Sequence, residues 1–228
     1  MKLLSIDTAS NVCGVSILED KNLICKLDTD TGRTHSENLM PMIENAFSKT
    51  SLSLKDIDLI ICDKGPGSFT GIRIGVATAK AFHDSMNIPC VGVSSLESLA
   101  YNVKSNGYIC SILDCKNENC YFAIYKLNDG IYTEIIKPSA DTVQNFLTIL
   151  KNYEDTITFV GDGALTYQNE ISLAITNACF VQKDKNILDS YILGLAGFDK
   201  YLKKALNDVL PLYLRQPQAQ RQLEENLK

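Results

Sequence analysis

The 228-residue sequence lacks an apolar run long enough to cross a bilayer, and residues 59–62 are typical of its longest. Asp7 interrupts the apolar stretch that a secretory signal would need, so we expect a cytoplasmic protein without membrane contact. Basic residues are also too few for a nucleic-acid stripe, since 22 of them against 27 acidic residues give a net charge of −5. We therefore expect this chain alone to bind nucleic acid poorly.

Histidine and paired cysteine, the usual metal and nucleophile residues, are scarce. The two histidines are far apart, and Leu39 stands where an H-x-x-x-H motif starting at His35 needs its second ligand. Without a G-x-S-x-G elbow, no Ser-His-Asp or Cys-His arrangement is supported. Cys110, Cys115 and Cys120 lack C-x₂₋₄-C spacing, so we predict no metal site. Eight cysteines in all are too few for a small disulfide-stapled domain.

The first half predicts three strands followed by alternating helices and strands. Its first helix begins at a capping box formed by Thr34 and Glu37, and Pro41 inside it should kink the helix or shift its start. The predicted strands are residues 2–6, 12–18, 23–27, 57–62 and 88–93. The other predicted helices are residues 71–86 and 94–103.

The second half repeats this order of elements. Asp7 ends the first strand and Asp114 ends its counterpart, an offset of 107 that also carries Cys13 onto Cys120. Such a repeat indicates an α/β protein of two mixed-sheet domains, residues 1–103 and 104–228, the second with an extended C-terminal tail. Its predicted strands are residues 108–113, 119–127, 131–136 and 157–160. Helices are predicted at residues 141–153 and, closing this half, at residues 187–206.

The loop that follows the first strand carries a carboxylate and hydroxyls, at Asp7, Thr8 and Ser10. Such a loop can hold a metal–phosphate group through its backbone N–H and hydroxyl donors. The same residue types also favour an ordinary strand-to-strand turn. Both interpretations stay open on the residues alone.

The most distinctive stretch is residues 65–75, Gly-Pro-Gly-Ser-Phe-Thr-Gly-Ile-Arg-Ile-Gly, which leads from a strand into a helix. It lacks the Gly-Lys-Ser/Thr ending of a Walker loop, and it does not match G-x-G-x-x-G. Gly71, Gly75 and Ala79 form a ridge almost without side chains, which lets another element approach closely. That element is a second protein or another part of this chain.

Several stretches together resemble the bacterial TsaB (YeaZ) family, with the glycine-rich segment as the specific signature. These stretches are residues 6–9, 35–39, 65–75, 113–121 and 211–215. The match spans nearly the whole chain, with departures from the family's pattern at Cys115 and Lys116. The resemblance implies the duplicated actin-like/Hsp70-like ATPase (ribonuclease H-like) fold.

The resemblance also implies a non-catalytic role. Family members partner TsaD, a protein of the same fold, and with the ATPase TsaE they support threonylcarbamoylation of the adenosine beside the anticodon in tRNAs reading ANN codons. It further implies a homodimer in isolation, tRNA contact only through the complex, and no cofactor except a nucleotide at the shared interface. The implied interface residues are Leu39, Ile43, Gly71, Gly75, Val76, Ala79 and Phe82. A remnant phosphate loop would comprise Asp7, Thr8, Ser10, Gly161 and Gly163.

Two other functions stay open on the sequence. A nucleotide-hydrolysing or kinase-like enzyme of this fold would use Asp7, Thr8 and Ser10 around phosphates, with Gly161 and Gly163 near the base. Ala9 replaces the glycine that such loops usually carry, and no catalytic base is evident. A metallopeptidase, the older label of this glycoprotease-like superfamily, would require a stoichiometric metal.

Overall fold

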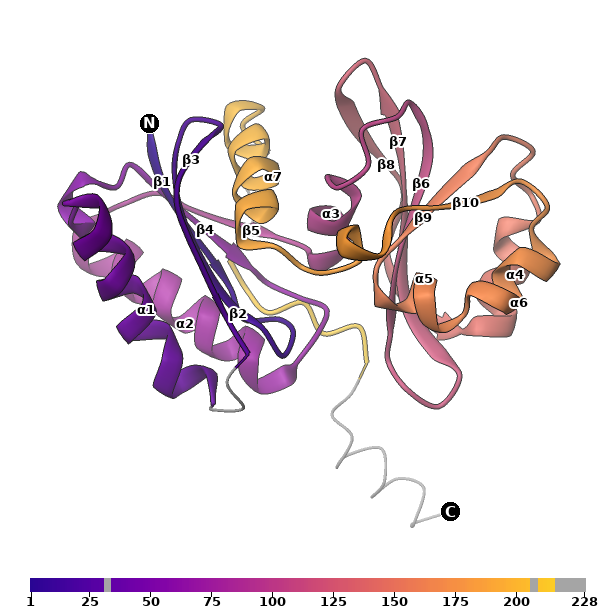
Figure 1. Cartoon of the computed structure of the whole chain (residues 1–228), viewed down its shortest axis with the longest axis horizontal. Helices are drawn as coiled ribbons and strands as arrows, with labels where there is room; N and C mark the ends of the chain where they lie inside the picture. Colours follow the sequence, from indigo (N-terminus) through magenta and orange to yellow (C-terminus); the bar gives the residue numbers. More distant parts are fainter. Residues whose placement is uncertain (31–33, 206–208, 216–228) are drawn as a thin grey trace, which may run out of the picture.

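The computed structural model describes residues 1–30, 34–205 and 209–215. Two five-stranded sheets stand side by side, with helices on their outer faces and between them (Figure 1). The first half contains β1 (Lys2–Asp7), β2 (Cys13–Glu19), β3 (Asn22–Thr29), α1 (His35–Thr50), β4 (Leu59–Asp63), α2 (Phe69–Met86), β5 (Cys90–Val93) and α3 (Ser95–Ala100). One 3₁₀ turn, η1 (Leu54–Asp56), precedes β4.

The second half has the same order of strands. It contains β6 (Gly107–Asp114), β7 (Asn119–Asn128), β8 (Ile131–Thr142), α4 (Val143–Leu150), β9 (Ile157–Val160), α5 (Asp162–Thr166), α6 (Gln168–Ala174), β10 (Ala178–Phe180), η2 (Lys183–Lys185) and α7 (Ser190–Leu202). The sheets are ordered β3-β2-β1-β4-β5 and β8-β7-β6-β9-β10, so each strand has a counterpart. The predicted α/β duplication with two mixed sheets is confirmed.

Two parallel pairs form the centre of the two sheets. β1 pairs with β4 through Ile6 and Cys62, and β6 pairs with β9 through Ser111 and Val160. Every residue of β4 is buried, as expected for a short apolar strand covered on both faces. The carboxyl ends of these strands therefore meet at one edge of each sheet, where loops can bring side chains together.

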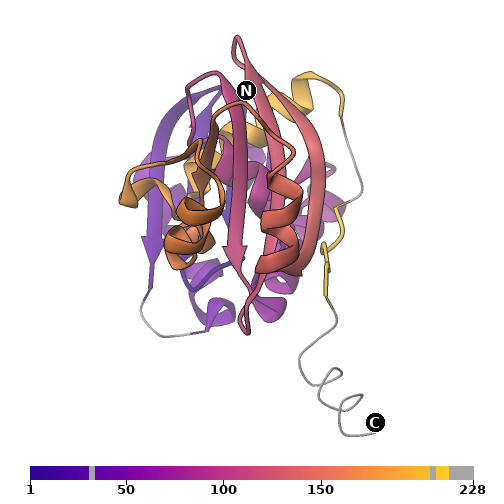
Figure 2. The same cartoon turned by 90° about the vertical axis from the view of Figure 1, so that its right-hand side faces the viewer.

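Helices α1 and α2 cover the outer face of the first sheet, and α4 to α6 cover that of the second. Figure 2 views the molecule from the second half, where salmon and orange helices lie in front of their sheet. α1 begins at His35 as predicted, because the Thr34 N–H donates to Glu37 Oε2 over 3.0 Å in a capping box. Pro41 lies inside this helix and does not shift its start. Among the described residues, no helix is long and apolar enough to span a membrane.

The last helix of each half packs on the sheet of the other half. α3 lies on β6 and β7, with Leu96 and Leu99 among the residues of that core. α7 lies on β1, β2 and β4, where Leu193 and Ala196 pack with Ile61. The helix predicted at residues 187–206 is present as α7, and it packs on the first sheet rather than on the sheet of its own half. An apolar helix pattern shows that a helix is buried and does not show which sheet receives it.

Other differences from the predicted elements are local. β8 extends to Thr142 and shortens the helix predicted at residues 141–153 to α4. Three short elements, α5, α6 and β10, were not predicted, because each is too short to show a periodic pattern. Cys110 and Cys120 lie fully buried within β6 and β7.

Candidate site at the ends of the central strands

Two carboxylates end the two central parallel strands of the first sheet. Asp7 and Asp63 directly follow the paired residues Ile6 and Cys62, so they are neighbours across β1 and β4. Asp7 is 3% exposed and Asp63 is fully buried. The sequence reasoning identified Asp7 and missed Asp63. The available signal was an aspartate at the end of a second apolar strand, parallel to the one that ends in Asp7.

Each carboxylate is only half satisfied. Asp7 Oδ1 accepts a hydrogen bond from the Ala9 N–H over 3.1 Å. Asp63 Oδ1 accepts from the Gly65 N–H over 2.6 Å and from the Ser95 hydroxyl over 2.7 Å. Both Oδ2 atoms are buried and have no hydrogen-bond partner among the described residues. Unpaired buried oxygens of this kind cost free energy and favour the protonated carboxyl.

Burial is the main reason why both carboxyls are hard to ionise. Burial raises the pKa of Asp7 to about 7, with the charges of Asp189 and Asp28 adding to the rise and the Ala9 N–H opposing it. Burial also raises the pKa of Asp63 well above its usual range, and the Asp7 charge adds to that rise. Like charges so close in a dry site disfavour each other.

The loop after β1 uses its own polar groups. The Thr8 hydroxyl donates to the Gly71 carbonyl over 2.8 Å, and Ser10 Oγ accepts from the Val12 N–H over 3.1 Å. The Ala9 carbonyl in turn accepts from the Ser68 N–H over 2.7 Å. A phosphate would need these donors free. The groups present therefore do not fit a bound phosphate.

His35 ties helix α1 to the same loop. Its Nε2 lies 2.7 Å from the Ser10 carbonyl oxygen, while its Nδ1 is buried without a partner among the described residues. That contact holds the start of α1 against the loop after β1. Over residues 1–30, 34–205 and 209–215, no three His, Cys, Asp or Glu side chains are grouped closely enough to hold a metal ion.

The predicted glycines of the second half lie at the end of β9. A Cβ atom on Gly161 would overlap the Ile112 carbonyl oxygen, and one on Gly163 would lie 3.0 Å from the Asp114 N–H nitrogen. The Gly161 N–H donates to Asn186 Oδ1 over 2.9 Å. Both glycines thus permit close packing of β9 and α5 on β6. Asp7, Thr8 and Ser10 lie on a different element, at the end of β1.

The small-residue ridge of α2 is covered by the chain itself. A Cβ atom on Gly71 would overlap the Thr8 carbonyl oxygen, and one on Gly75 would overlap Thr8 Oγ1. Ala79 is fully buried in the same core. The prediction that a second protein meets this ridge is therefore wrong for this fold. The other interpretation, close packing inside the chain, is what the structure has.

The remaining predicted interface residues also face inward. Leu39, Ile43 and Val76 are 1%, 2% and 4% exposed and belong to the core between the helices and the first sheet. Phe82 is half-buried against that core. Helical spacing identified an apolar face correctly, but that face covers the chain's own sheet. These side chains therefore do not form an exposed surface.

The outer face of α1 and α2 carries a different set of small and apolar residues. Met40 is 43% exposed, Met86 is 39% exposed, and Ala77 and Ala81 are also exposed. Ile74 is half-buried and shares one face of α2 with Ala77 and Ala81, at i, i+3 and i+7 spacing. We call these five residues the α1–α2 outer face. The sequence analysis did not identify them, because the ridge of Gly71, Gly75 and Ala79 is the stronger sequence signal for close helix contact.

The segment after α7 returns to the glycine-rich loop. Tyr213 stacks on Phe69 with ring centroids 4.3 Å apart, and Arg73 Nε donates to its hydroxyl over 2.7 Å. The Leu212 N–H donates to the Lys64 carbonyl over 2.7 Å. Arg215 Nη1 lies 3.4 Å from the Cys115 carbonyl oxygen of the second half. Residues 209–215 thus lie as an extended segment on the chain's own surface and join both halves.

The repeated β-β-β-α-β-α-β order, with the final helices exchanged between two sheets, defines a two-domain protein of the actin-like ATPase fold. A solved structure described as YeaZ from Pseudomonas aeruginosa has this fold, with a TM-score of 0.76 over 93% of this chain and 99% of that one. Its sequence is 20% identical, so this likeness concerns the fold alone.

The sequence comparisons place the chain more narrowly. Residues 29–223 match the profile of the family described as TsaD, tRNA N6-adenosine threonylcarbamoyltransferase, and the chain belongs to this family. Within this family, the chain is similar to TsaB proteins over most of its length. The TsaB protein of Bacillus subtilis is 29% identical over 79% of this chain and 80% of its own length. That of Buchnera aphidicola subsp. Baizongia pistaciae is 28% identical over 94% and 98%.

Proposed function

We propose that this chain takes part in tRNA threonylcarbamoyladenosine biosynthesis as a non-catalytic subunit. In this proposal it pairs with TsaD, and together with TsaE the pair modifies the adenosine next to the anticodon of tRNAs reading ANN codons. The names of its relatives, TsaB biosynthesis proteins, support the pathway. The family profile names the transferase that we propose as its partner.

One observation carries the non-catalytic role: the loop after β1 is filled by the chain's own groups. The Thr8 hydroxyl donates to the Gly71 carbonyl, and Ser10 Oγ accepts from the Val12 N–H. The Ala9 N–H donates to Asp7 Oδ1. A phosphate-binding loop works by offering such groups to its ligand. We therefore expect any nucleotide of the complex at the interface with TsaD rather than in this loop.

The proposed partner surface is the α1–α2 outer face. Exposed methionines adapt to a partner's shape, and small residues let another helix approach closely. Ile74, Ala77 and Ala81 share one face of α2 at i, i+3 and i+7 spacing, and Met40 on α1 and Met86 at the end of α2 are exposed. We propose that TsaD binds here, and that in its absence a second copy of this chain occupies the same face as a homodimer. The net charge of −5 supports leaving tRNA contact to the partners.

Reconstitution tests this role. Modification of a tRNA that reads ANN codons is measured with TsaD and TsaE, with and without this chain. We expect modification to fall to background without it. Undiminished modification in its absence would refute the subunit role.

One observation favours a second function, a nucleotide-dependent enzyme. Asp7 and Asp63 leave two buried carboxylate oxygens without partners, as reactive sites often do. Calorimetry of the isolated chain with ATP and magnesium separates the two functions. Tight binding would favour the enzyme, and no heat of binding would favour the non-catalytic subunit.

A further inference from the structure

Residues 209–215 connect the carboxyl ends of the two sheets, and we call them the C-terminal strap. The Leu212 N–H donates to the carbonyl of Lys64, the residue that directly follows β4, over 2.7 Å. Arg215 Nη1 lies 3.4 Å from the carbonyl oxygen of Cys115, the residue that directly follows β6. Figure 1 shows the strap in yellow, passing below α3 from the first half toward the second. One short segment thus contacts a strand end of each sheet.

Aromatic stacking anchors the strap on the first half. The rings of Tyr213 and Phe69 are parallel within 4°, and their centroids are 4.3 Å apart. Arg73 Nε donates to the Tyr213 hydroxyl over 2.7 Å, and its guanidinium carbon lies 5.2 Å from the centroid of the Phe69 ring. Val209 packs against the core of the first sheet. Stacked rings with a cation beside them add attraction to the burial of the ring faces, so this end of the strap follows the first half.

Arg215 anchors the strap on the second half. This side chain is half-buried, and its Nη1 lies 3.1 Å from Cys115 Sγ in addition to its contact with the Cys115 carbonyl. A hydrogen bond donated by a guanidinium is stronger than one between neutral groups. The Cys115 N–H donates to the Asn119 carbonyl over 3.1 Å, so the accepting backbone is itself fixed in the turn between β6 and β7.

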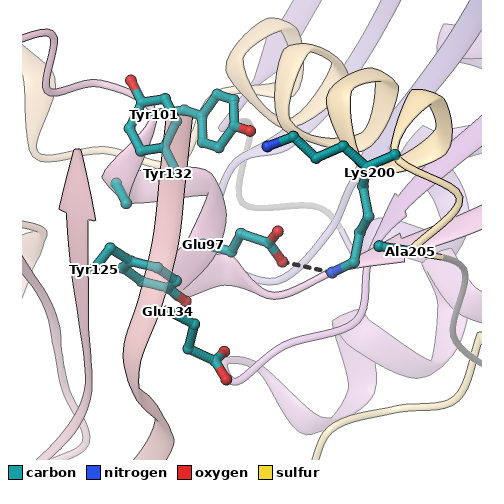
Figure 3. Close-up of a pocket in the computed structure, with 9 residues that line it drawn as sticks. Glu97, Tyr101, Tyr125, Tyr132, Glu134, Lys200 and Ala205 are labelled. Atoms are coloured by element: carbon teal, nitrogen blue, oxygen red, sulfur yellow. Dashed lines mark hydrogen bonds and ion pairs between the residues drawn. The ribbon is translucent and has the colours of Figure 1, made fainter. Parts of the chain in front are cut away.

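Away from the strap, the two halves meet where α3 contacts α7. Lys200 Nζ donates to Glu97 Oε2 over 2.7 Å, in the ion pair that Figure 3 shows, and the Tyr101 hydroxyl lies 3.4 Å from Asp199 Oδ2. A cavity of about 240 Å³ beside this contact, with Tyr125 among its lining residues, leaves the packing here incomplete. Two bodies joined at one such contact can rotate about it, so a second contact elsewhere fixes their angle.

The length of the strap limits how far the ends of the two sheets can separate. Leu212 and Arg215 are three residues apart, and an extended chain spans at most about 3.3–3.6 Å per residue. The backbone between them therefore covers about 10–11 Å at most, and the arginine side chain covers the rest of the distance. The edge where β4 and β6 end can open further only when one of the two anchors is released.

We propose that the C-terminal strap is a latch that holds the two halves closed at the carboxyl ends of β4 and β6. When either anchor is released, the halves rotate about the contact between α3 and α7. The loops after β1, β4 and β6 then become accessible to solvent, and with them the carboxyl groups of Asp7 and Asp63. The inference goes beyond the proposed function and does not depend on it.

Hydrogen–deuterium exchange of the full chain, measured by mass spectrometry, tests the latch. Arg215→Gln releases the anchor on the second half, and Tyr213→Ala releases the anchor on the first. We expect each variant to speed amide exchange at least about fivefold both in residues 64–71 and in residues 114–119, because either anchor restrains both strand ends. β7 should exchange as in the wild type, since the second sheet stays intact.

Two further variants are the controls. Lys151→Gln removes an exposed positive charge away from the strap and should leave exchange unchanged. Tyr213→Phe keeps the stacked ring and removes only the hydroxyl that accepts from Arg73, so it should speed exchange less than Tyr213→Ala.

Three results would overturn the latch. Faster exchange only at the anchor that each variant removes would show two independent local contacts. Wild-type exchange in Arg215→Gln would show that this side chain restrains nothing. Equally faster exchange in β7 would show a loss of global stability instead of a rotation of the halves.

Discussion

The two halves share one strand order but treat the aspartate at the end of their first strand differently. In the first half, Asp7 is buried beside Asp63, and each keeps an oxygen without a partner. In the second half, Asp114 Oδ1 accepts from the Tyr167 hydroxyl over 2.7 Å and from the Lys116 N–H over 2.9 Å. Its Oδ2 lies 3.6 Å from Lys116 Nζ.

Asp7 and Asp114 occupy equivalent positions in the two sheets but have opposite effects on folding stability. The carboxyl group of Asp114 stabilises its loop through hydrogen bonds and a nearby ammonium group. The carboxyl groups of Asp7 and Asp63 oppose folding when they ionise, because burial removes their hydration and the Asp7 charge further disfavours an ionised Asp63. The first half therefore contains a costly pair of buried carboxyl groups, while the equivalent aspartate of the second half forms stabilising hydrogen bonds.

The largest expected effect concerns the close packing of α2 against the loop that follows Asp7. Gly71→Val would place side-chain atoms into the Thr8 carbonyl oxygen, which is backbone and cannot turn away. We expect the free energy of unfolding to fall by about 3 kcal/mol, measured by urea denaturation. Ala81→Leu, on the exposed side of the same helix, is the control and should change it by less than about 0.5 kcal/mol. A Gly71→Val variant as stable as this control would show that the loop is not packed as described.

The second prediction concerns how the effect of replacing Asp7 on stability depends on pH. The pKa of Asp7 is about 7 when folded, against an ordinary value of 3.8, so the folded state holds the proton more tightly. Wild-type stability should therefore fall as pH rises from about 4 to 7 and stay low above that range. Asp7→Asn removes this loss and should stabilise the protein by about 2–4 kcal/mol at pH 8. Below the unfolded pKa the gain should vanish.

Denaturation of wild type and Asp7→Asn across pH 4 to 8 checks this prediction, those two pH values being about the limits of the linkage window. Asp114→Asn is the matched control from the second half. It should not stabilise the protein at any pH in that window, because Asp114 has hydrogen-bond partners. A pH-independent effect of Asp7→Asn would show that folding does not raise the pKa of Asp7.

A smaller effect is expected from the hydrogen bond between Tyr167 and Asp114 in the second half. Tyr167→Phe removes the hydroxyl that donates to Asp114 and leaves the ring in its buried place. We expect a loss of about 1–1.5 kcal/mol in the free energy of unfolding, the usual net value of one such hydrogen bond. Thermal and urea denaturation measure it. A neutral result would mean that Asp114 finds an equal partner in water.

The sequence predicted the parts of the fold that depend on local pattern. The capping box at Thr34 placed the start of α1, and the offset between Asp7 and Asp114 revealed the duplication. The receiving sheet of α7 was not predictable, because a helix with several apolar faces can be buried against either sheet. Strand register and contacts between residues far apart in the chain leave no periodic pattern in the sequence.

The candidate site was predictable in part for the same reason. Asp7 was identified from its loop, but the neighbour Asp63 depends on the parallel pairing of β1 and β4. The ridge of Gly71 and Gly75 correctly indicated a close approach, and only the structure shows that Thr8 is what approaches. The cavity around Tyr125 joins residues from both halves, so no local motif marks it.

We propose that this chain acts through the α1–α2 outer face rather than through Asp7 and Asp63. The most direct measurement is the rate of tRNA threonylcarbamoylation reconstituted with TsaD and TsaE, comparing Asp7→Asn/Asp63→Asn with Ala81→Lys. We predict that the double carboxylate variant keeps the wild-type rate and that Ala81→Lys lowers it at least about tenfold, since a buried unpaired charge at an interface costs several kcal/mol. Loss of activity in the double variant together with full activity of Ala81→Lys would contradict the account.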